Sequence, residues 1–213
     1  MLFIDSLTGK VLWFKFLKNE TNQDYKEGLN YLEGRGFEIQ GVVTDGKRWL
    51  DRVFVKYPYQ ICQFHVQKGI RTLLTKNPRS DAGKELYLIN KIFIKDRLTE
   101  QELGNKLAEF TKTHEQFLNE KSEKDPTKFK HEKILKALRK YKNNLRFMFT
   151  YQKEGNQKQI KDNPTKQIPN TANDIDGGQF SPLKKLLGNH NGLSKEHRKT
   201  LIIQFCNSRG KNF

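Results

Sequence analysis

The stretch IQGVVTDGKRWLDRVFVKYPYQICQFH, residues 39–65, decides the fold. Residues 39–44 are uncharged and rich in valine, which predicts a short strand covered on both faces. Asp45 ends this strand, residues 49–54 predict a short amphipathic helix, and residues 59–64 predict a second strand. A carboxylate just past the carboxyl end of a central strand lies where open α/β sheets place their ligands. The sequence therefore predicts a site organised around Asp45.

The segment before this stretch predicts a hairpin followed by a helix. Residues 1–5 and 11–16 have strand composition, and Gly9 between them can adopt the positive φ that short hairpin loops require. Thr21 is the expected N-cap of the helix, with Asp24 as its capping-box partner. The order over the first part of the chain is therefore β-β-α-β-α-β.

Beyond His65 the period-2 pattern is replaced by helical periodicity. The expected helices cover about 66–76, 82–95, 99–122 and 130–150. On the last of them, apolar and basic residues occupy opposite sides. The apolar side holds Ile134, Leu138, Tyr141, Leu145 and Phe149, and the basic side holds Lys133, Lys136, Arg139 and Lys140. The basic side is either a solvated surface or a contact with a nucleic-acid backbone.

The C-terminal segment predicts two further helices after a polar linker. The second runs from Ser194, as N-cap, through Phe205. The first is either a kinked helix counted from Asp176 or a helix that restarts with Ser181 as N-cap and Pro182 at its first position.

Composition favours a basic protein of a reducing compartment. The chain has 213 residues, with 40 Lys and Arg against 24 Asp and Glu, a formal net charge of +16. Such an excess attracts polyanions, of which nucleic acid is the usual one, although a merely solvated basic surface stays open. Two cysteines are too few for a disulfide framework. No apolar run approaches the roughly 20 residues that span a bilayer, and no signal peptide is recognisable.

Two acids stand out by their positions, Asp45 at a strand end and Asp176 after the long helical stretch. Carboxylates without a Cys/His cluster prefer Mg²⁺ or Mn²⁺, and two such ions can clamp the attacking and leaving oxygens of a phosphodiester. The alternative is that Asp45 is a turn residue, because Asp-Gly is a common turn dipeptide. Cys62 and His65 are two candidate ligands where structural zinc takes four. We expect Cys62 to pack in the second strand, and His65 at its end to support the site.

These residues resemble a known family. VVTDGKRWLDRVF and PYQICQFHVQKGIR resemble the core of Mutator-like DDE transposases of bacterial insertion sequences, in which a strand-end Asp-Gly is followed by a Cys/Asp-x-x-His motif. IPNTANDIDGGQFSPLKKLLGNHNGLS resembles the block that carries their third acid. The resemblance implies that Asp45 is the second catalytic, metal-binding acid and Asp176 the third, with Asp174 as the nearest rival. It also implies that His65 and Cys62 are the paired motif.

The resemblance also implies a first acid on the first strand of a three-stranded meander. The chain supplies two strands before its first helix, so Asp5 matches a hairpin residue better than that first acid. We therefore expect the first strand and its acid to lie upstream of residue 1.

The expected fold class is α/β, an RNase H-like mixed sheet with a large all-α insertion. Residues 1–65 are the first part of the core, 66–165 the helical insertion, and 166–213 the C-terminal core helices. The resemblance implies Mg²⁺-dependent (or Mn²⁺-dependent) DNA cleavage and strand transfer. The alternatives are an inactive or repurposed DNA-binding fragment and an RNase H-fold nuclease or resolvase. Six residues are candidate DNA contacts: Lys47, Arg48, Lys68, Arg71, Lys184 and Lys185.

The partners that follow from this interpretation are double-stranded DNA, both transposon ends and target, and further copies of the chain. No membrane partner is expected. The expected location is the cytoplasm, in association with the nucleoid.

Overall fold

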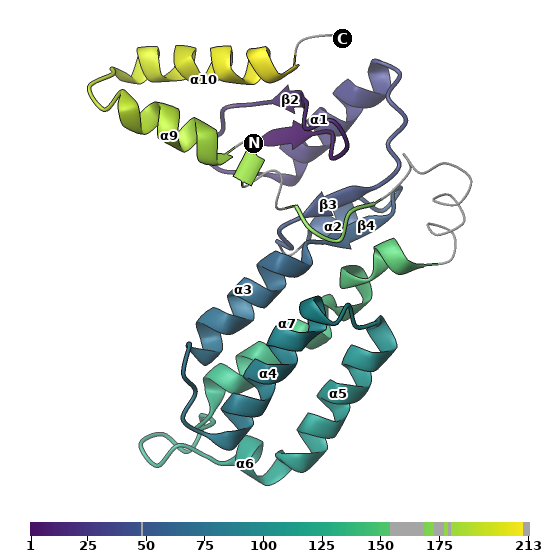
Figure 1. Cartoon of the computed structure of the whole chain (residues 1–213), viewed down its shortest axis with the longest axis vertical. Coiled ribbons are helices and arrows are strands. Elements are labelled where there is room, and N and C mark those ends of the chain that lie inside the picture. Colours follow the sequence, from purple (N-terminus) through teal and green to yellow (C-terminus); the bar gives the residue numbers. More distant parts are fainter. Residues whose placement is uncertain (48, 154–167, 173–176, 179, 211–213) are drawn as a thin grey trace. The chain divides into compact units, whose positions relative to one another are not determined.

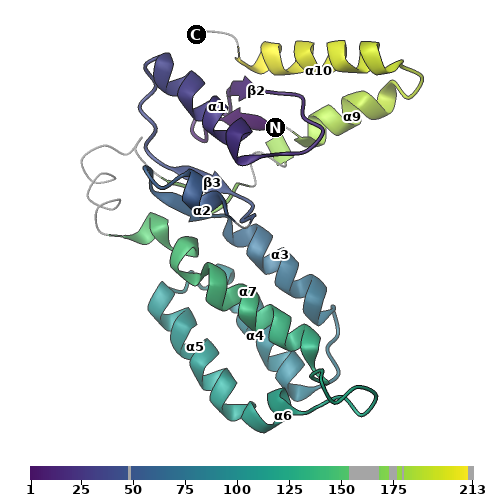
Figure 2. The same ribbon diagram turned by 180° about the vertical axis from the view of Figure 1, so that it is seen from behind.

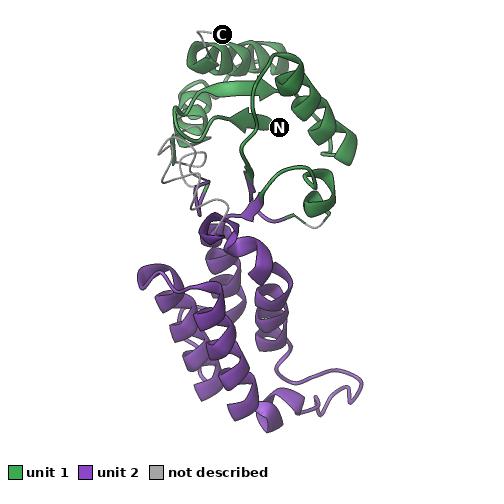
Figure 3. Cartoon of the chain, turned by 90° about the vertical axis from the view of Figure 1, so that its right-hand side faces the viewer, with its two compact units in different colours: residues 1–42, 47–58, 172–213 green, residues 43–46, 59–171 purple. Residues whose placement is uncertain are grey.

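The computed structural model describes residues 1–47, 49–153, 168–172, 177–178 and 180–210. The chain divides into two compact units (Figure 3). Unit 1 contains residues 1–42, 47–58 and 172–213, and unit 2 contains residues 43–46 and 59–171.

Unit 1 is built on a hairpin of β1 (Leu2–Ile4) and β2 (Val11–Phe14), which pair antiparallel with Phe3 opposite Trp13. The helix α1 (Asn22–Gly34) packs on this hairpin (Figure 1). Gly28 allows the close approach, because a Cβ there would lie 2.8 Å from the Phe3 ring and 2.9 Å from the Trp13 ring. The predicted hairpin and helix are both present.

The capping box predicted for α1 is confirmed. Asp24 donates its backbone N–H to the Thr21 Oγ1 at 3.3 Å, and the Asp24 carboxylate accepts from the Thr21 N–H at 3.0 Å. Tyr25, Leu29 and Leu32 form the buried stripe of the helix. Lys15 on the hairpin side donates to the same Asp24 carboxylate at 3.0 Å, which ties the helix start to the segment after β2.

Three more helices complete unit 1. They are α2 (Leu50–Val53), α9 (Ser181–Asn189) and α10 (Lys195–Gly210). The structure gives α9 a start at Ser181, so Ser181 is its first residue and not the predicted N-cap. Phe180 occupies the N-cap position without a side-chain capping hydrogen bond. Ser194 precedes α10 and accepts the His197 N–H at 3.2 Å, as its predicted N-cap role requires.

A small sheet is formed by β3 (Val42–Thr44) and β4 (Tyr59–Ile61), all of whose residues except Val42 belong to unit 2. The Val42 N–H donates to the Pro58 carbonyl at 2.9 Å and the Cys62 N–H to the Thr44 carbonyl at 2.8 Å, so the strands run in the same direction. Strand β3 is half-buried rather than covered on both faces as predicted, because in the described part of the chain its sheet has only two strands.

The prediction of a strand over residues 59–64 is wrong at its end. Strand β4 stops at Ile61, and α3 (Gln63–Leu74) starts two residues later. The buried residues Gln63, Val66, Ile70 and Leu74 recur at helical spacing, and this periodicity decides the conformation. Cys62 is therefore the N-cap of α3 and His65 lies in its first turn, neither of them in a strand.

The helices of unit 2 pack as a bundle (Figures 1 and 2). Each of four helices contacts two neighbours: α3 and α5 both contact α4, and both contact α7. The bounds are α4 (Asp81–Lys95), α5 (Glu100–Thr113), α6 (Glu115–Asn119), α7 (Glu132–Met148) and the 3₁₀ turn η1 (Thr150–Gln152).

The faces predicted for α7 are confirmed. Ile134, Leu138, Tyr141 and the following Phe149 are buried, whereas Lys133, Lys136 and Arg139 are exposed. Leu145 and Lys140, predicted for the apolar and the basic side, are both half-buried. The Tyr141 hydroxyl donates to Asn90 Oδ1 at 2.7 Å, which joins α7 to α4 inside the bundle.

The coarse fold prediction is confirmed, since the chain is mixed α/β and mainly helical. Its strands form two sheets of two strands each in the described part of the chain. None of the described helices has the length and apolar character to cross a bilayer.

Candidate functional site

Asp45 is an exposed residue that directly follows the carboxyl end of β3. Before it, Thr44 Oγ1 accepts the Gly46 N–H at 3.2 Å and bonds the Tyr59 hydroxyl at 2.8 Å. After it, Gly46 has φ of 83°, and a Cβ there would lie 2.8 Å from the Ile61 side chain. Both conditions select glycine, so the turn that carries Asp45 is fixed by its neighbours.

Cys62 and His65 adjoin this turn from the start of α3. Cys62 is fully buried and donates its backbone N–H to Thr44, the residue before Asp45. His65 is half-buried in the first turn of α3, with the Phe64 ring edge-on to it at 6.0 Å between centroids. The Cys62 thiol therefore packs, as predicted, but beneath a helix start rather than within a strand.

The segment around Asn170 returns to the same place from far along the chain. The Gln63 N–H donates to the Asn170 carbonyl at 3.0 Å, and Asn170 Nδ2 donates to Gln63 Oε1 at 3.1 Å. Gln63 Nε2 donates to the Met148 carbonyl at 2.9 Å, so one buried amide connects Asn170 to the end of α7. The Asp-Gly turn, the Cys-x-x-His segment and Asn170 are thus connected within unit 2.

Sequence reasoning did not single out Gln63 or Asn170. The signal for Gln63 was a polar residue on the otherwise apolar stripe of α3. A buried amide needs partners for both ends, and Gln63 obtains them from two segments more than eighty residues away in sequence.

The third-acid candidates Asp174 and Asp176 lie outside the described residues, as does Arg48. Among the described residues, no three His, Cys, Asp or Glu side chains gather into a group that could hold a metal ion. Asp45 is thus the one predicted metal ligand that the structure describes, and its exposed oxygens suit a hard cation.

Asp5 has a local role. Its carboxylate accepts the backbone N–H groups of Leu7 and Thr8, each at 3.2 Å, and the Thr8 hydroxyl. Both oxygens are engaged by its own loop, in agreement with the interpretation of Asp5 as a hairpin residue.

The candidate DNA contacts fall into both units. Lys68 and Arg71 are exposed on α3 in unit 2, and Lys184 and Lys185 are exposed on α9 in unit 1. Lys47 is paired with Glu20 within unit 1. Burial opposes ionisation of Glu20, but the hydrogen bonds from Lys47 and Tyr25 prevail and lower its pKa.

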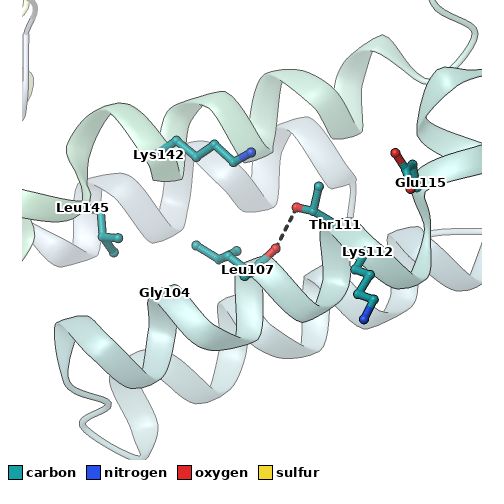
Figure 4. A pocket seen from close by; sticks show the side chains of 8 residues that line it. Gly104, Leu107, Thr111, Lys112, Glu115, Lys142 and Leu145 are labelled. Carbon is teal, nitrogen blue, oxygen red and sulfur yellow. Dashed lines mark hydrogen bonds between the residues drawn. The ribbon is translucent and has the colours of Figure 1, made fainter.

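A separate groove of about 500 Å³ lies between α5 and α7 (Figure 4). Its floor is apolar, with Leu107 and Leu145, and Lys112, Lys142 and Glu115 lie around it. Thr111 Oγ1 on its wall donates to the Leu107 carbonyl at 2.7 Å within α5. The groove contains none of the predicted site residues.

Comparison of the chain with protein-family models, with curated proteins and with solved structures finds no match.

Proposed function

We propose that this chain holds the second and third acids of the catalytic region of a DDE-type transposase, a class of enzyme that cleaves DNA and transfers strands with Mg²⁺. In this proposal the fold is RNase H-like, with the helices from α3 to α7 as its insertion. Asp45 and Asp176 hold the metal, and His65 supports them. A metal ion held there would supply Lewis-acid stabilisation of charge at the phosphate.

The observation that carries the proposal is the pairing of Gln63 with Asn170. In the family, the third acid follows the helical insertion and must return to the strand-end acid. Here the chain leaves at Gln63, forms the bundle and returns with Asn170 against the same residue. Asp176 follows Asn170 by six positions. The Thr44–Cys62 hydrogen bond of 2.8 Å connects this point to Asp45.

A second candidate is a DNA-binding protein that does not cut. The favouring observation is the exposed basic surface of unit 2, which includes Lys68, Arg71 and Arg139. The nuclease or resolvase interpretation gains less support, because such a protein does not need the helical bundle between Gln63 and Asn170.

Metal binding by the whole chain separates these candidates. Mn²⁺ is titrated against the protein by electron paramagnetic resonance, with Mg²⁺ as competitor, for the wild type and for Asp45→Asn. We expect Asp45→Asn to weaken Mn²⁺ binding at least tenfold, about 1.4 kcal/mol or more, because it removes a charged ligand and keeps the side-chain size. Asp96→Asn, which changes an exposed acid in the same unit, is the matched control.

Nicking of supercoiled plasmid with Mg²⁺ is the second measurement. Nicking that disappears in Asp45→Asn and persists in Asp96→Asn supports the transposase proposal. DNA binding with no Asp45-dependent metal site would overturn it in favour of the non-cutting protein.

A further inference from the structure

The outward side of α3 is a continuous polar and basic stripe. At about 100° per residue, His65, Lys68 and Thr72 lie opposite the buried residues of the helix, whereas Arg71 lies on one flank and Gly69 on the other. Lys68 and Arg71 are exposed, and Thr72 Oγ1 donates to the Lys68 carbonyl at 3.0 Å within the helix. The stripe begins at His65, itself a predicted site residue, and runs along α3 toward Thr72.

Gly69 gives this stripe a cation from another helix. A Cβ at Gly69 would lie 2.7 Å from Lys140 Cε and 2.9 Å from its Nζ, so the Lys140 side chain occupies the space that the glycine leaves. Gly69 is one helical turn after His65 and therefore on the same side of α3. The amino group of Lys140, from α7, thus lies on α3 beside the stripe.

The surface around this position contains few acids. Helices α3 and α7 pack side by side (Figures 1 and 2), and residues 52–80 and 133–153 contain no Asp or Glu. Lys136 is paired with Glu132 at the start of α7, at 3.1 Å. Within the described part of the chain, no ion pair joins Lys68, Arg71 or Lys140 to an acid. Their charges are therefore available to a partner.

We infer that Lys68 and Lys140 form a phosphate-binding track for duplex DNA on the helical bundle, and that Gly69 leaves the space in which the Lys140 side chain lies. Lysine side chains neutralise backbone phosphates, and such contacts bind a duplex without base readout. The choice of DNA as the polyanion rests on the proposed function. Binding at the track requires neither a metal ion nor Asp45.

The test uses a matched set of variants in the full chain. Lys140→Gln removes the charge of the amino group that lies beside Gly69. Gly69→Ala keeps every charge but displaces the end of the Lys140 side chain from the space beside residue 69. The displacement costs little free energy of folding, because that end of the side chain is flexible. Lys142→Gln removes the same charge from the same helix on its other flank, at the groove of Figure 4, and is the control.

Binding of a short fluorescein-labelled duplex is followed by fluorescence anisotropy over a range of KCl concentrations. The slope of log K against log [KCl] becomes shallower by about 0.9 for each phosphate that the protein no longer neutralises. We expect this change for Lys140→Gln and most of it for Gly69→Ala, with wild-type slope for Lys142→Gln. Gly69→Ala should melt at or above the wild-type temperature, since alanine favours a helix by about 1 kcal/mol.

Equal slopes for Lys140→Gln and Lys142→Gln would overturn the inference, because only net charge would then matter. A wild-type slope for Gly69→Ala would show that the space at Gly69 does not position Lys140 for phosphate binding. These outcomes are independent of the Mn²⁺ measurement. Asp45→Asn could leave metal binding unchanged while Lys140→Gln still changes the salt slope. That result would support the track and contradict the proposed function.

Discussion

The pairing of Gln63 with Asn170 predicts a measurable coupling energy between two positions far apart in sequence. Gln63→Ala removes the hydrogen bonds to the Met148 carbonyl and from Asn170 Nδ2, at 2.9 and 3.1 Å. Each is worth about 1 kcal/mol net. The Met148 carbonyl keeps a second donor, Gln60 Nε2 at 2.7 Å, so it is not left unsatisfied.

The reduced packing adds to this cost. The Gln63 residue is 2 % exposed, and a buried methylene contributes about 0.8 kcal/mol. The sum for Gln63→Ala is therefore about 3 kcal/mol. Asn170→Ala should cost about 1 kcal/mol, because its backbone carbonyl still accepts the Gln63 N–H. The double variant loses the shared hydrogen bond once, so the coupling energy is about 1 kcal/mol.

The assay is urea unfolding followed by far-UV circular dichroism. Both tryptophans, Trp13 and Trp49, lie in unit 1, so tryptophan fluorescence follows unit 1. Far-UV dichroism follows the helices of both units, so the part of its change that the fluorescence does not share reports unit 2. Thr111→Ala on α5, whose hydroxyl bonds within its own helix, is the additive control with Gln63→Ala. Additivity of Gln63→Ala with Asn170→Ala would show that the two segments do not meet, and the main support for the proposed function would be removed.

Two further predictions concern α1. Gly28→Ala should destabilise unit 1 by about 1 kcal/mol, since overpacking against two aromatic rings costs about 2 kcal/mol and the helix gains about 1 kcal/mol. Gly34→Ala, with nothing within 4 Å of its Cβ, is the control and should be neutral or stabilising. Both are measured by tryptophan fluorescence in urea. Thr21→Ala should cost about 1 kcal/mol at neutral pH. Hydrogen bonds from Thr21 and then from Lys15 lower the pKa of Asp24, so their stabilisation is present above its ordinary pKa and is lost as the pH falls through the lowered value. The difference between wild type and Thr21→Ala should therefore shrink in acid, and a difference independent of pH would contradict this account.

Local chemistry made much of the secondary structure predictable. The capping box at Thr21 and the two faces of α7 depend on residues within a few positions of one another, so the sequence alone contains them. The prediction extended β4 beyond Ile61 because Ile61, Cys62 and Gln63 suit either a strand or a helix start. Gln63 belongs to the helix because its amide reaches Met148 and Asn170, which no local pattern reveals.

The predicted site was partly accessible from sequence for the same reason. Asp45, Gly46 and the motif at Cys62 and His65 are close in sequence, and their residue types indicated a strand-end acid with a neighbouring pair. The contact between Lys140 and Gly69 could not be predicted from the sequence, because the register of α7 against α3 sets which lysine faces the glycine.

By itself, the sequence determined the net charge of +16, the hairpin and helices, and an acid held at a strand end by the glycine that follows. These follow from side-chain chemistry and periods of two and 3.6 residues. Only the tertiary structure decided that Asn170 meets Gln63 and that Lys140 lies on α3. Contacts between distant segments depend on how whole faces pack, and a buried polar or charged group stays where the opposing surface gives it a partner or a space.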